Sequence, residues 1–319
     1  MKKIQKLFLS AAMVVGMMGA FTVAAPTTTV SAAWPVVSEV TQTNATKNSI
    51  SVTWAGTDCV NYNIYYKDVT NYDSDFKLAG QVDSTVNEYT INGLKAGKEY
   101  YVKVEGLSED GNDDDSTLYD AVTLVDKISN LKQDTWYHWI EEASVEWDKL
   151  PAAEKYEYII KNGKGKKVKS GTCDSYYLGF NVKNNQVYTF QVRAVQKYNG
   201  KTYYSSWNTI KVFEQPWITK AKLEKKKLKL KWAKQTGATG YDIYVATSNK
   251  NAKNYKKVKS VGKNTTSVTL SKFKGKKLTK KNYYVYIVSK TKLNGKTCYS
   301  GKVYCFKVNA GGFINGYIG

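Results

Sequence analysis

Three stretches of this 319-residue chain share one pattern, and the pattern recurs at nearly regular intervals. The stretches read NSISVTWAGTDCVNYNIYYK, EEASVEWDKLPAAEKYEYIIK and KKLKLKWAKQTGATGYDIYVA. In each, an alternating segment ends in tryptophan, a short turn follows, and the next segment opens on tyrosine. The tryptophans are Trp54, Trp147 and Trp232, and the tyrosines are Tyr62, Tyr156 and Tyr241. The tryptophans lie 93 and 85 positions apart, which is the length of one small sandwich domain. The repeat therefore predicts three similar modules.

The periodicity inside each repeat is that of β-strands. Segments such as YYVKVEG, YTFQVRA and YYVYIVS alternate with period two and carry β-branched or aromatic residues on one face. The pairs Asn199-Gly200 and Asn294-Gly295 stand between strand runs, where Asn-Gly favours a type I′ hairpin turn. No apolar period of 3.6 residues is sustained beyond the first 33 residues. The sequence therefore predicts an all-β protein.

These residues resemble the fibronectin type III module, three times over, across residues 36 to 309. The resemblance rests on the tryptophan that ends the second strand, on YNIY and YDIY, and on the tyrosine corner of that family. In that corner an apolar residue stands six positions before the tyrosine, as in Leu94 to Tyr100 and in Val182 to Tyr188. The third module departs from the pattern, because LTKKNYY makes either Tyr283 or Tyr284 the corner residue.

The resemblance implies a seven-stranded Greek-key sandwich that serves as a spacer or a binding unit and is rarely a catalyst. KYNGKTYYSSW and KLNGKTCYSG are similar to the lysine- and tyrosine-rich versions found on secreted Gram-positive proteins. The predicted fold class is all-β, with three tandem fibronectin-type-III-like (immunoglobulin-like) β-sandwiches after a signal peptide. The predicted division is a signal peptide at 1–33, an acidic module at 34–126, a second module at 127–215, a strongly basic module at 216–309 and a Gly-rich tail at 310–319.

The start of the chain predicts export. Lys2, Lys3 and Lys6 precede an apolar stretch that runs to Ala25, and VSAAW offers a small-residue cleavage site after Ala32 or Ala33. A retained membrane anchor is the alternative, since the apolar stretch is about long enough to span a bilayer. We expect cleavage, a secreted or extracellular protein for which the cell wall is one candidate location, and no transmembrane segment thereafter. The short linkers predict a semi-rigid array. The tail is expected to be too small to fold, and it carries no Leu-Pro-x-Thr-Gly sorting motif.

Charge is distributed very unevenly along the chain. Residues 34–126 carry a net charge of −10, residues 127–215 carry +5 and residues 216–319 carry +23. Such asymmetry suggests an electrostatic partner. Of the 48 basic residues, Arg193 is the single arginine. Because bidentate base recognition favours arginine, this composition argues against sequence-specific nucleic-acid binding.

The lysines of the third module fall into two groups. In KAKLEKKKLKLKW the leucines and tryptophan alternate with lysine, as in a half-buried strand with a lysine-covered outer face. A second group crowds the segment before the tyrosine corner. The candidate polyanion-binding residues are Lys220, Lys222, Lys227, Lys229, Lys231, Lys272, Lys274, Lys276, Lys277, Lys280 and Lys281. The expected partners are anionic cell-wall polymers or other extracellular polyanions; a merely solvated coat that guards against aggregation is the alternative.

Other candidate sites are weaker. Trp136, Trp139 and Trp207 are candidates for stacking on glycans, although such residues more often pack in a core or a junction. The acidic SEDGNDDDSTLYD segment imitates the start of a calcium loop at Asp110, Asn112 and Asp114 but lacks the later ligands. It is also suited to head-to-tail self-association with the basic module. No catalytic or metal-binding motif stands out, no cofactor is expected, and the four cysteines are predicted to be free thiols.

These patterns predict a secreted, non-enzymatic cell-surface binding or spacer protein whose third module attaches to anionic wall polymers. One alternative is a carbohydrate-binding accessory module of an extracellular hydrolase system. The other is a self-assembling structural surface protein.

Overall fold

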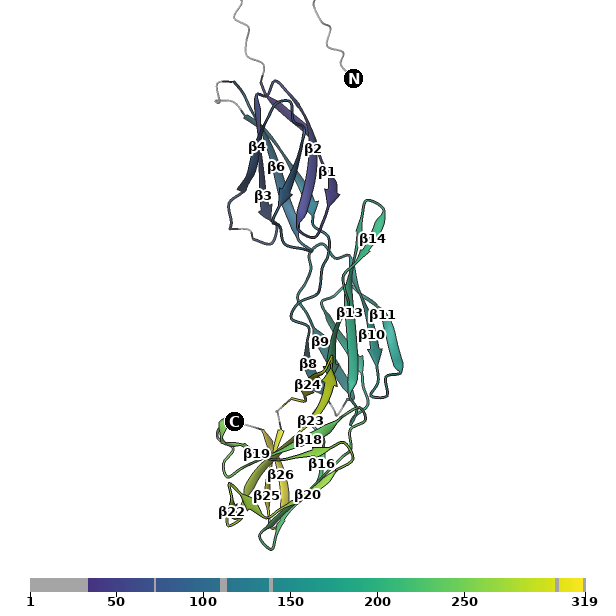
Figure 1. Cartoon of the computed structure of the whole chain (residues 1–319), viewed down its shortest axis with the longest axis vertical. Coiled ribbons are helices and arrows are strands. Elements are labelled where there is room, and N and C mark those ends of the chain that lie inside the picture. Colours follow the sequence, from purple (N-terminus) through teal and green to yellow (C-terminus); the bar gives the residue numbers. More distant parts are fainter. Residues whose placement is uncertain (1–33, 72, 110–113, 138–139, 302–303, 318–319) are drawn as a thin grey trace, which may run out of the picture.

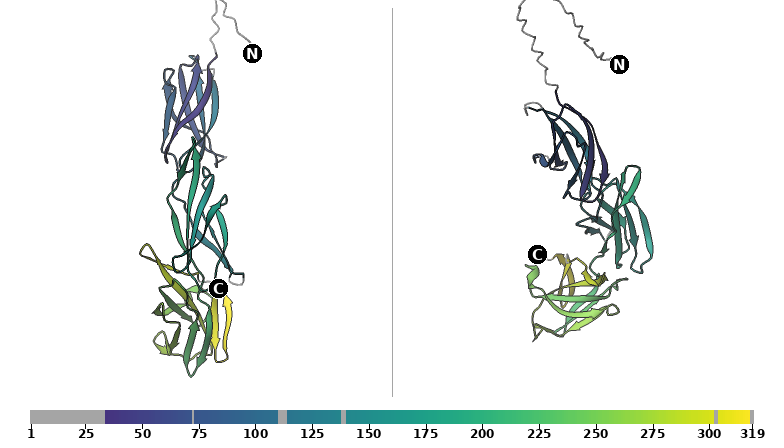
Figure 2. Two further views of the ribbon diagram at one scale, coloured as in Figure 1. Left: turned by 90° about the vertical axis from the view of Figure 1, so that its right-hand side faces the viewer. Right: turned by 45° about the horizontal axis from the view of Figure 1, so that its top comes forward.

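The structure, a computed structural model, describes residues 34–71, 73–109, 114–137, 140–301 and 304–317. The predicted signal peptide therefore lies outside the described residues. Three β-sandwiches follow one another along an elongated molecule, with module one at the top of Figure 1 and module three at the bottom. Figure 2 shows the same end-to-end order, and its right-hand view shows module three turned away from the line of the first two modules.

Module one is a sandwich of a three-stranded and a four-stranded antiparallel sheet, with strand orders β1-β2-β5 and β4-β3-β6-β7. Its strands are β1 (Val36–Ala45), β2 (Ser49–Thr57), β3 (Asn61–Asp68), β4 (Lys77–Asp83), β5 (Glu88–Asn92), β6 (Glu99–Leu107) and β7 (Asp114–Val122). The alternation read from the sequence decides which side chains enter the core. In β2, for example, Ile50, Val52 and Trp54 are buried.

Module two repeats this arrangement, with sheets β8-β9-β12 and β11-β10-β13, and with β14 and β15 both pairing with β13. Its strands are β8 (Lys132–Tyr137), β9 (Glu142–Glu146), β10 (Lys155–Lys161), β11 (Lys167–Cys173), β12 (Tyr177–Asn181), β13 (Tyr188–Tyr198), β14 (Lys201–Tyr204) and β15 (Asn208–Val212). The three-plus-four frame is therefore kept, with the last strand divided into two pieces.

Module three has sheets β16-β17-β20 and β19-β18-β23-β25-β26, and β24 pairs with β23. Its strands are β16 (Ile218–Glu224), β17 (Lys227–Trp232), β18 (Gly240–Ala246), β19 (Lys256–Gly262), β20 (Ser267–Leu270), β21 (Lys272–Phe273), β22 (Lys276–Lys277), β23 (Tyr283–Leu293), β24 (Lys296–Tyr299), β25 (Tyr304–Asn309) and β26 (Gly312–Tyr317). The single helix among the described residues is the short 3₁₀ turn η1 (Ala252–Asn254). The predicted all-β fold is confirmed.

The repeated tryptophan and tyrosine form the same contact in every module. Each tryptophan ring meets the tyrosine ring of the next strand edge-on, with centroids 5.3 Å apart in modules one and two and 5.5 Å apart in module three. Edge-to-face aromatic pairs of this kind contribute about 0.5–1.5 kcal/mol beyond the area they bury. The sequence repeat is thus a repeat of one core contact.

The tyrosine corner is present in all three modules. The hydroxyl of Tyr100 accepts a hydrogen bond from the Lys95 amide at 2.9 Å, and that of Tyr188 accepts one from the Lys183 amide at 2.7 Å. In module three the corner residue is Tyr283, which accepts from the amides of Thr279 and Lys280 at 3.0 and 3.2 Å. Its apolar partner Leu278 is buried but stands five positions before the tyrosine instead of six. The ambiguity left by the sequence is thereby resolved.

Both Asn-Gly pairs form the predicted hairpin turns. Asn199 and Gly200 have φ values of 47° and 71°, and Asn294 and Gly295 have values of 49° and 77°. A type I′ turn requires positive φ at both central positions, which Asn-Gly adopts with little strain. The resulting hairpins extend from modules two and three toward the preceding module, as the positions of β14 and β24 in Figure 1 show.

The described part of the Gly-rich tail forms a strand, contrary to the prediction that the tail is too small to fold. Residues 312–317 form β26, which pairs with β25 from Tyr304–Tyr317 to Asn309–Gly312. Phe313 packs against the core of module three and meets Phe306 edge-on at 5.6 Å. The prediction was wrong because it was based on the glycine content of the tail. A free strand edge supplies backbone hydrogen bonds to any segment that lies beside it, whatever the strand propensity of that segment.

Glutamine side chains bind the modules to one another. Between modules one and two, Gln196 accepts from the Val125 amide at 3.0 Å and donates to the Thr123 carbonyl at 3.1 Å. Between modules two and three, Gln215 accepts from the Tyr304 amide at 2.7 Å and donates to the carbonyls of Tyr304 and Ile287. Apolar packing adds to these contacts, since Val187 of module two belongs to the core of module three.

Candidate polyanion-binding surface

The outer face of β16 and β17 carries two rows of lysine side chains. Leu228, Leu230 and Trp232 point into the core, so the alternate residues of β17 face outward. The strand register places Lys220 opposite Lys231 and Lys222 opposite Lys229. We call the five outward lysines of these strands the lysine sheet: Lys220, Lys222, Lys227, Lys229 and Lys231, all exposed. The structure thus brings the predicted lysines of β16 and β17 together.

This register is electrostatically unfavourable for the fold alone. Like charges directly opposite each other on neighbouring strands destabilise a sheet, whereas opposite charges contribute about 0.2–1 kcal/mol. One carboxylate lies at the edge of the lysine sheet: Glu224 is 2.7 Å from the Lys229 ammonium, which lowers the pKa of Glu224. Lys220, Lys222, Lys227 and Lys231 make no ion pair or side-chain hydrogen bond within the described residues. The face therefore carries a surplus of positive charge.

The turn between β16 and β17 adds two lysines that the sequence analysis did not select. Lys225 and Lys226 have φ values of 48° and 58°, as a type I′ turn requires. A non-glycine residue in this left-handed region costs roughly 1–2 kcal/mol. Asn-Gly adopts the same conformation at two other turns of this chain. A less strained pair of residues would therefore form this turn as well, so the turn itself does not require lysine. The signal in the sequence was EKKK between two alternating strands.

The second lysine group, in the segment before the tyrosine corner, forms a short hairpin. β21 and β22 pair Lys272 with Lys277 and Phe273 with Lys276, and the turn residues Lys274 and Gly275 have φ values of 51° and 78°. Phe273 packs against the core and meets Tyr283 edge-on at 6.3 Å. This anchor leaves Lys272, Lys274, Lys276 and Lys277 exposed, with Lys280 and Lys281 exposed just beyond.

The hairpin and the Lys225–Lys226 turn lie at the same end of module three. Leu228 pairs with Leu270, so the start of β17 lies beside the end of β20, from which the hairpin continues. Both features are therefore far from the junction with module two, near the bottom of Figure 1. We call these lysines together with the lysine sheet the basic surface, which lies over one sheet and at the distal end of the module.

The other acidic residue of module three is also paired. Asp242 is 1% exposed, with a carboxylate oxygen 2.7 Å from the Lys290 ammonium and another 3.5 Å from Lys257. Burial alone would raise the pKa of Asp242, but hydrogen bonds from Lys290 and Ser260 and the nearby charges hold it below its ordinary value. Asp242 lies on β18 in the opposite sheet, so it does not neutralise the lysine sheet.

The structure describes two of the three candidate glycan-stacking residues, Trp136 and Trp207. Trp136 packs against the core of module two, 6.0 Å from the ring of Tyr188. Trp207 is covered by the guanidinium of Arg193, which lies 4.8 Å from its ring and 4.0 Å from that of Tyr204. Trp139 lies outside the described residues, as do His138 and the calcium-like residues Asp110 and Asn112.

The described part of the chain lacks both a metal-ligand cluster and a helix that could span a membrane. Among those residues, no cluster of three His, Cys, Asp or Glu side chains is placed to hold a metal ion. No helix within the same ranges is long and apolar enough to cross a membrane. The four cysteines are free thiols, as predicted.

The fold and this surface define a tandem array of antiparallel β-sandwiches that ends in a strongly basic module. Residues 35–120 match the family model of the fibronectin type III domain, and module one therefore belongs to that family. The chain as a whole is an array of fibronectin-type-III-like modules, since modules two and three repeat the strand order, the aromatic pair and the tyrosine corner of module one. Domains of this family are commonly extracellular, non-catalytic binding or spacer modules.

The chain is similar to solved arrays of the same type. A two-domain fibronectin type III segment of chicken tenascin is 14% identical, with 56% of this chain and 98% of that chain covered and a TM-score of 0.31. The FN1–FN3 domains of chicken CNTN1 are 13% identical, with coverage of 86% and 98% and a TM-score of 0.35. No curated protein sequence matches the chain.

Proposed function

We propose that the protein is a secreted, non-enzymatic tether or spacer that binds anionic cell-wall polymers through the basic surface of module three. The observation that carries this proposal is the register of the lysine sheet, in which Lys220 faces Lys231 and Lys222 faces Lys229. A like-charge arrangement that weakens the free module becomes favourable when a polymer of phosphate or carboxylate groups lies across it. Each lysine near an anionic surface contributes about 1 kcal/mol, so several together retain a secreted protein.

The type of cation also supports a polymer over a shaped ligand. All the basic residues of module three are lysines, which act as point charges without the planar geometry of arginine. Binding of this kind depends on charge density and is weakened by salt. Module one, with its net charge of −10, would be repelled by the same polymer and directed away from it.

The test is retention of the full chain on purified cell walls, with and without their anionic polymers, over a salt series. We expect retention to require the polymers and to disappear between about 0.1 and 0.5 M salt, because screening shortens the reach of each charge. Replacing Lys220, Lys229 and Lys231 with glutamine is expected to weaken retention. The matched control replaces Lys256, Lys259 and Lys263, on and after the opposite edge strand β19, and removes the same charge.

Three results would contradict the proposal. Retention that survives 0.5 M salt or polymer removal would indicate a neutral glycan ligand. An equal loss of retention in the two triple variants would indicate that the net charge of module three, and not the lysine sheet, binds the polymer. Retention that depends on protein concentration through self-association would favour a structural assembly.

A further inference from the structure

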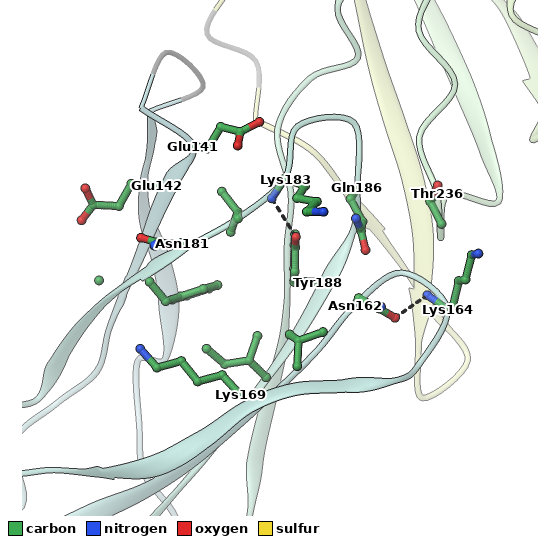
Figure 3. A pocket seen from close by; sticks show the side chains of 15 residues that line it. Glu141, Glu142, Asn162, Lys164, Lys169, Asn181, Lys183, Gln186, Tyr188 and Thr236 are labelled. Carbon is green, nitrogen blue, oxygen red and sulfur yellow. Dashed lines mark hydrogen bonds between the residues drawn. The ribbon is translucent and has the colours of Figure 1, made fainter.

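Module two contains a cavity of about 940 Å³ between its two sheets, on the side where β11 and β12 form the edges. Both strands end their sheets: within the described residues β11 pairs with β10 alone, and β12 pairs with β9 alone. Figure 3 shows the strands that carry Lys169 and Asn181 on opposite sides of the cavity. The cavity is therefore bordered by two strand edges whose outward backbone groups have no strand partner.

The floor of the cavity is part of the core of module two. Ile160, Phe180 and Val182 form a buried floor. The segment that leads into β13 is fixed by the Tyr188 hydroxyl, which accepts the Lys183 amide hydrogen bond drawn in Figure 3. A binding groove that is already formed loses less entropy when a ligand enters.

Module three closes one end of this groove. The Val187 amide donates to the Thr236 carbonyl at 2.9 Å, and the Thr236 amide donates to the Asn185 carbonyl at 3.0 Å. Gly163 lies so close to the Thr236 carbonyl that no Cβ would fit. The groove thus lies at a junction between two modules, which is a common location for binding sites.

The β11 side of the groove is basic. Lys164 and Lys169 line it, Lys166 and Lys167 are exposed beside them, and residues 158–173 contain no acidic side chain. Lys183 adds a positive charge from the loop before β13. Val168, which is 52% exposed, also lines the groove and offers an apolar contact between lysines. Two glutamates, Glu141 and Glu142, lie on the opposite wall.

We propose that this groove binds an extended acidic polypeptide segment, which pairs with the free edge of β11 and places carboxylates against Lys164, Lys169 and Lys183. An added strand gains main-chain hydrogen bonds, and pockets for alternate side chains give it specificity. A peptide suits the groove better than a glycan, because the rings of Phe180 and Tyr188 in its floor are buried and offer no face for a sugar to stack on. The proposal is independent of polymer binding by module three.

The test uses the full chain with Lys220, Lys229 and Lys231 replaced by glutamine, so that the lysine sheet does not dominate the signal. A fluorescent eight-residue peptide of alternating glutamate and valine is titrated at about 0.3 M salt, where long-range attraction is screened. The same peptide with one central valine replaced by proline keeps its charge but loses a backbone donor. We expect the proline peptide to bind about tenfold more weakly, because strand addition depends on main-chain hydrogen bonds.

Variants then locate the site. The double variant Lys164→Glu with Lys169→Glu is expected to bind the first peptide at least about tenfold more weakly. The control Lys256→Glu with Lys259→Glu, on the equivalent edge strand β19 of module three, should remain within about twofold. Hydrogen exchange should show protection of the backbone amides of residues 167–171 when the first peptide binds.

Other outcomes would overturn the proposal. Equal affinity for the two peptides, or an unprotected β11, would reduce the groove to a patch of charge. An equal loss in the β19 control would assign the binding to net charge. Stronger binding of an acidic oligosaccharide that displaces the peptide would make the groove a glycan site. If the folded protein does not bind the peptide, the lysines of β11 serve only to prevent aggregation through the free strand edge.

Discussion

Modules one and three share a fold but use the same sheet face in opposite ways. On the outer face of β1, β2 and β5, Thr41 is hydrogen-bonded to Thr53 at 3.2 Å and Ser51 to Thr90 at 2.9 Å. On the equivalent face of module three, two Lys–Lys pairs stand opposite each other. Cross-strand hydroxyl pairs stabilise a sheet, whereas like charges weaken it. The lysines of module three are therefore not required for the sandwich fold, because module one has the same fold without them.

The acidic residues of module one differ from the lysines of module three in a second way. Asp68 accepts hydrogen bonds from the amide and hydroxyl of Thr70. Asp83 accepts from Thr85 in the same manner, and these bonds lower the pKa of Asp83. Two carboxylates of module one thus shape turns, while four of the five lysines in the lysine sheet make no ion pair or side-chain hydrogen bond within the described residues. Positive charge in module three is therefore the better candidate for a binding role.

The largest effect is expected from the core contact that the two modules share. Trp232→Ala should lower the stability of module three by about 3–5 kcal/mol, and Trp54→Ala should do the same for module one. Hydrogen exchange measured by mass spectrometry would report each module separately. We expect Trp232→Ala to abolish wall retention and Trp54→Ala to preserve it. Loss of retention in both variants would show that the acidic module takes part in binding.

The tyrosine corners should differ in strength. Tyr283 accepts two backbone hydrogen bonds, whereas Tyr100 accepts one. Tyr283→Phe should therefore cost about 2 kcal/mol and Tyr100→Phe about 1 kcal/mol, since each lost hydrogen bond leaves one amide unpaired. Urea denaturation of the two variants, followed by the same module-resolved hydrogen exchange, measures the difference. Equal losses would mean that the weaker Lys280 bond contributes nothing.

The junction between modules two and three should respond to pH. Burial of Glu214 raises its pKa to about 7 from the ordinary value of 4.5. The folded state then holds a proton that the unfolded state has lost, so stability falls as pH rises from about 4.5 to 7 and is constant above. Discounted for the partial exposure of the carboxyl group, the change is about 1–2 kcal/mol. Thermal unfolding across this range measures it.

The variant Glu214→Gln provides the control for that measurement. It should remove the pH dependence and stabilise the junction at pH 8, because an amide carries no charge to bury. The junction between modules one and two depends on the uncharged Gln196 and should change little over the same range. A pH slope that persists in Glu214→Gln would assign the effect to another group.

The smallest effect concerns the lysine pairs themselves. Lys231→Glu should stabilise module three by about 0.2–1 kcal/mol, because it converts a like-charge pair with Lys220 into an opposite-charge pair. The same variant should weaken wall retention. Replacing both Thr41 and Thr53 of module one by lysine gives the reciprocal test and should destabilise module one by a similar amount. If the Lys231→Glu variant is more stable and still binds the wall as strongly as the original protein, the lysine pairs do not contribute to wall binding.

The fold was largely predictable because its determinants are local and repeated. Alternation, the Trp–Tyr pairs and the Asn-Gly turns each act over a few residues, and three copies confirm one another. The corner of module three was ambiguous because two tyrosines are adjacent and the spacing from Leu278 is one residue shorter. Strand β26 was missed because its order comes from the edge of β25, which lies beyond any local pattern.

The site was predictable only in part. The alternation of apolar and lysine residues in β17 predicted which lysines face outward, because in a strand the residues between core positions point away from the core. Lys225 and Lys226 were missed, since their positive φ values depend on the register of the two strands they join. The groove of module two could not be foreseen, because Gln186 and Thr236 come together only through the docking of two modules.

The even spacing of the lysine rows has a consequence for motion. Outward lysines recur every second residue of β16 and β17, so positive charges repeat about every 6.7 Å along each row. A bound polymer that shifts by one repeat meets the same charges again, and the lysine ammonium imposes no preferred direction on the chain. The proposed attachment would therefore permit sliding: the protein would diffuse along a polymer strand and still remain on it.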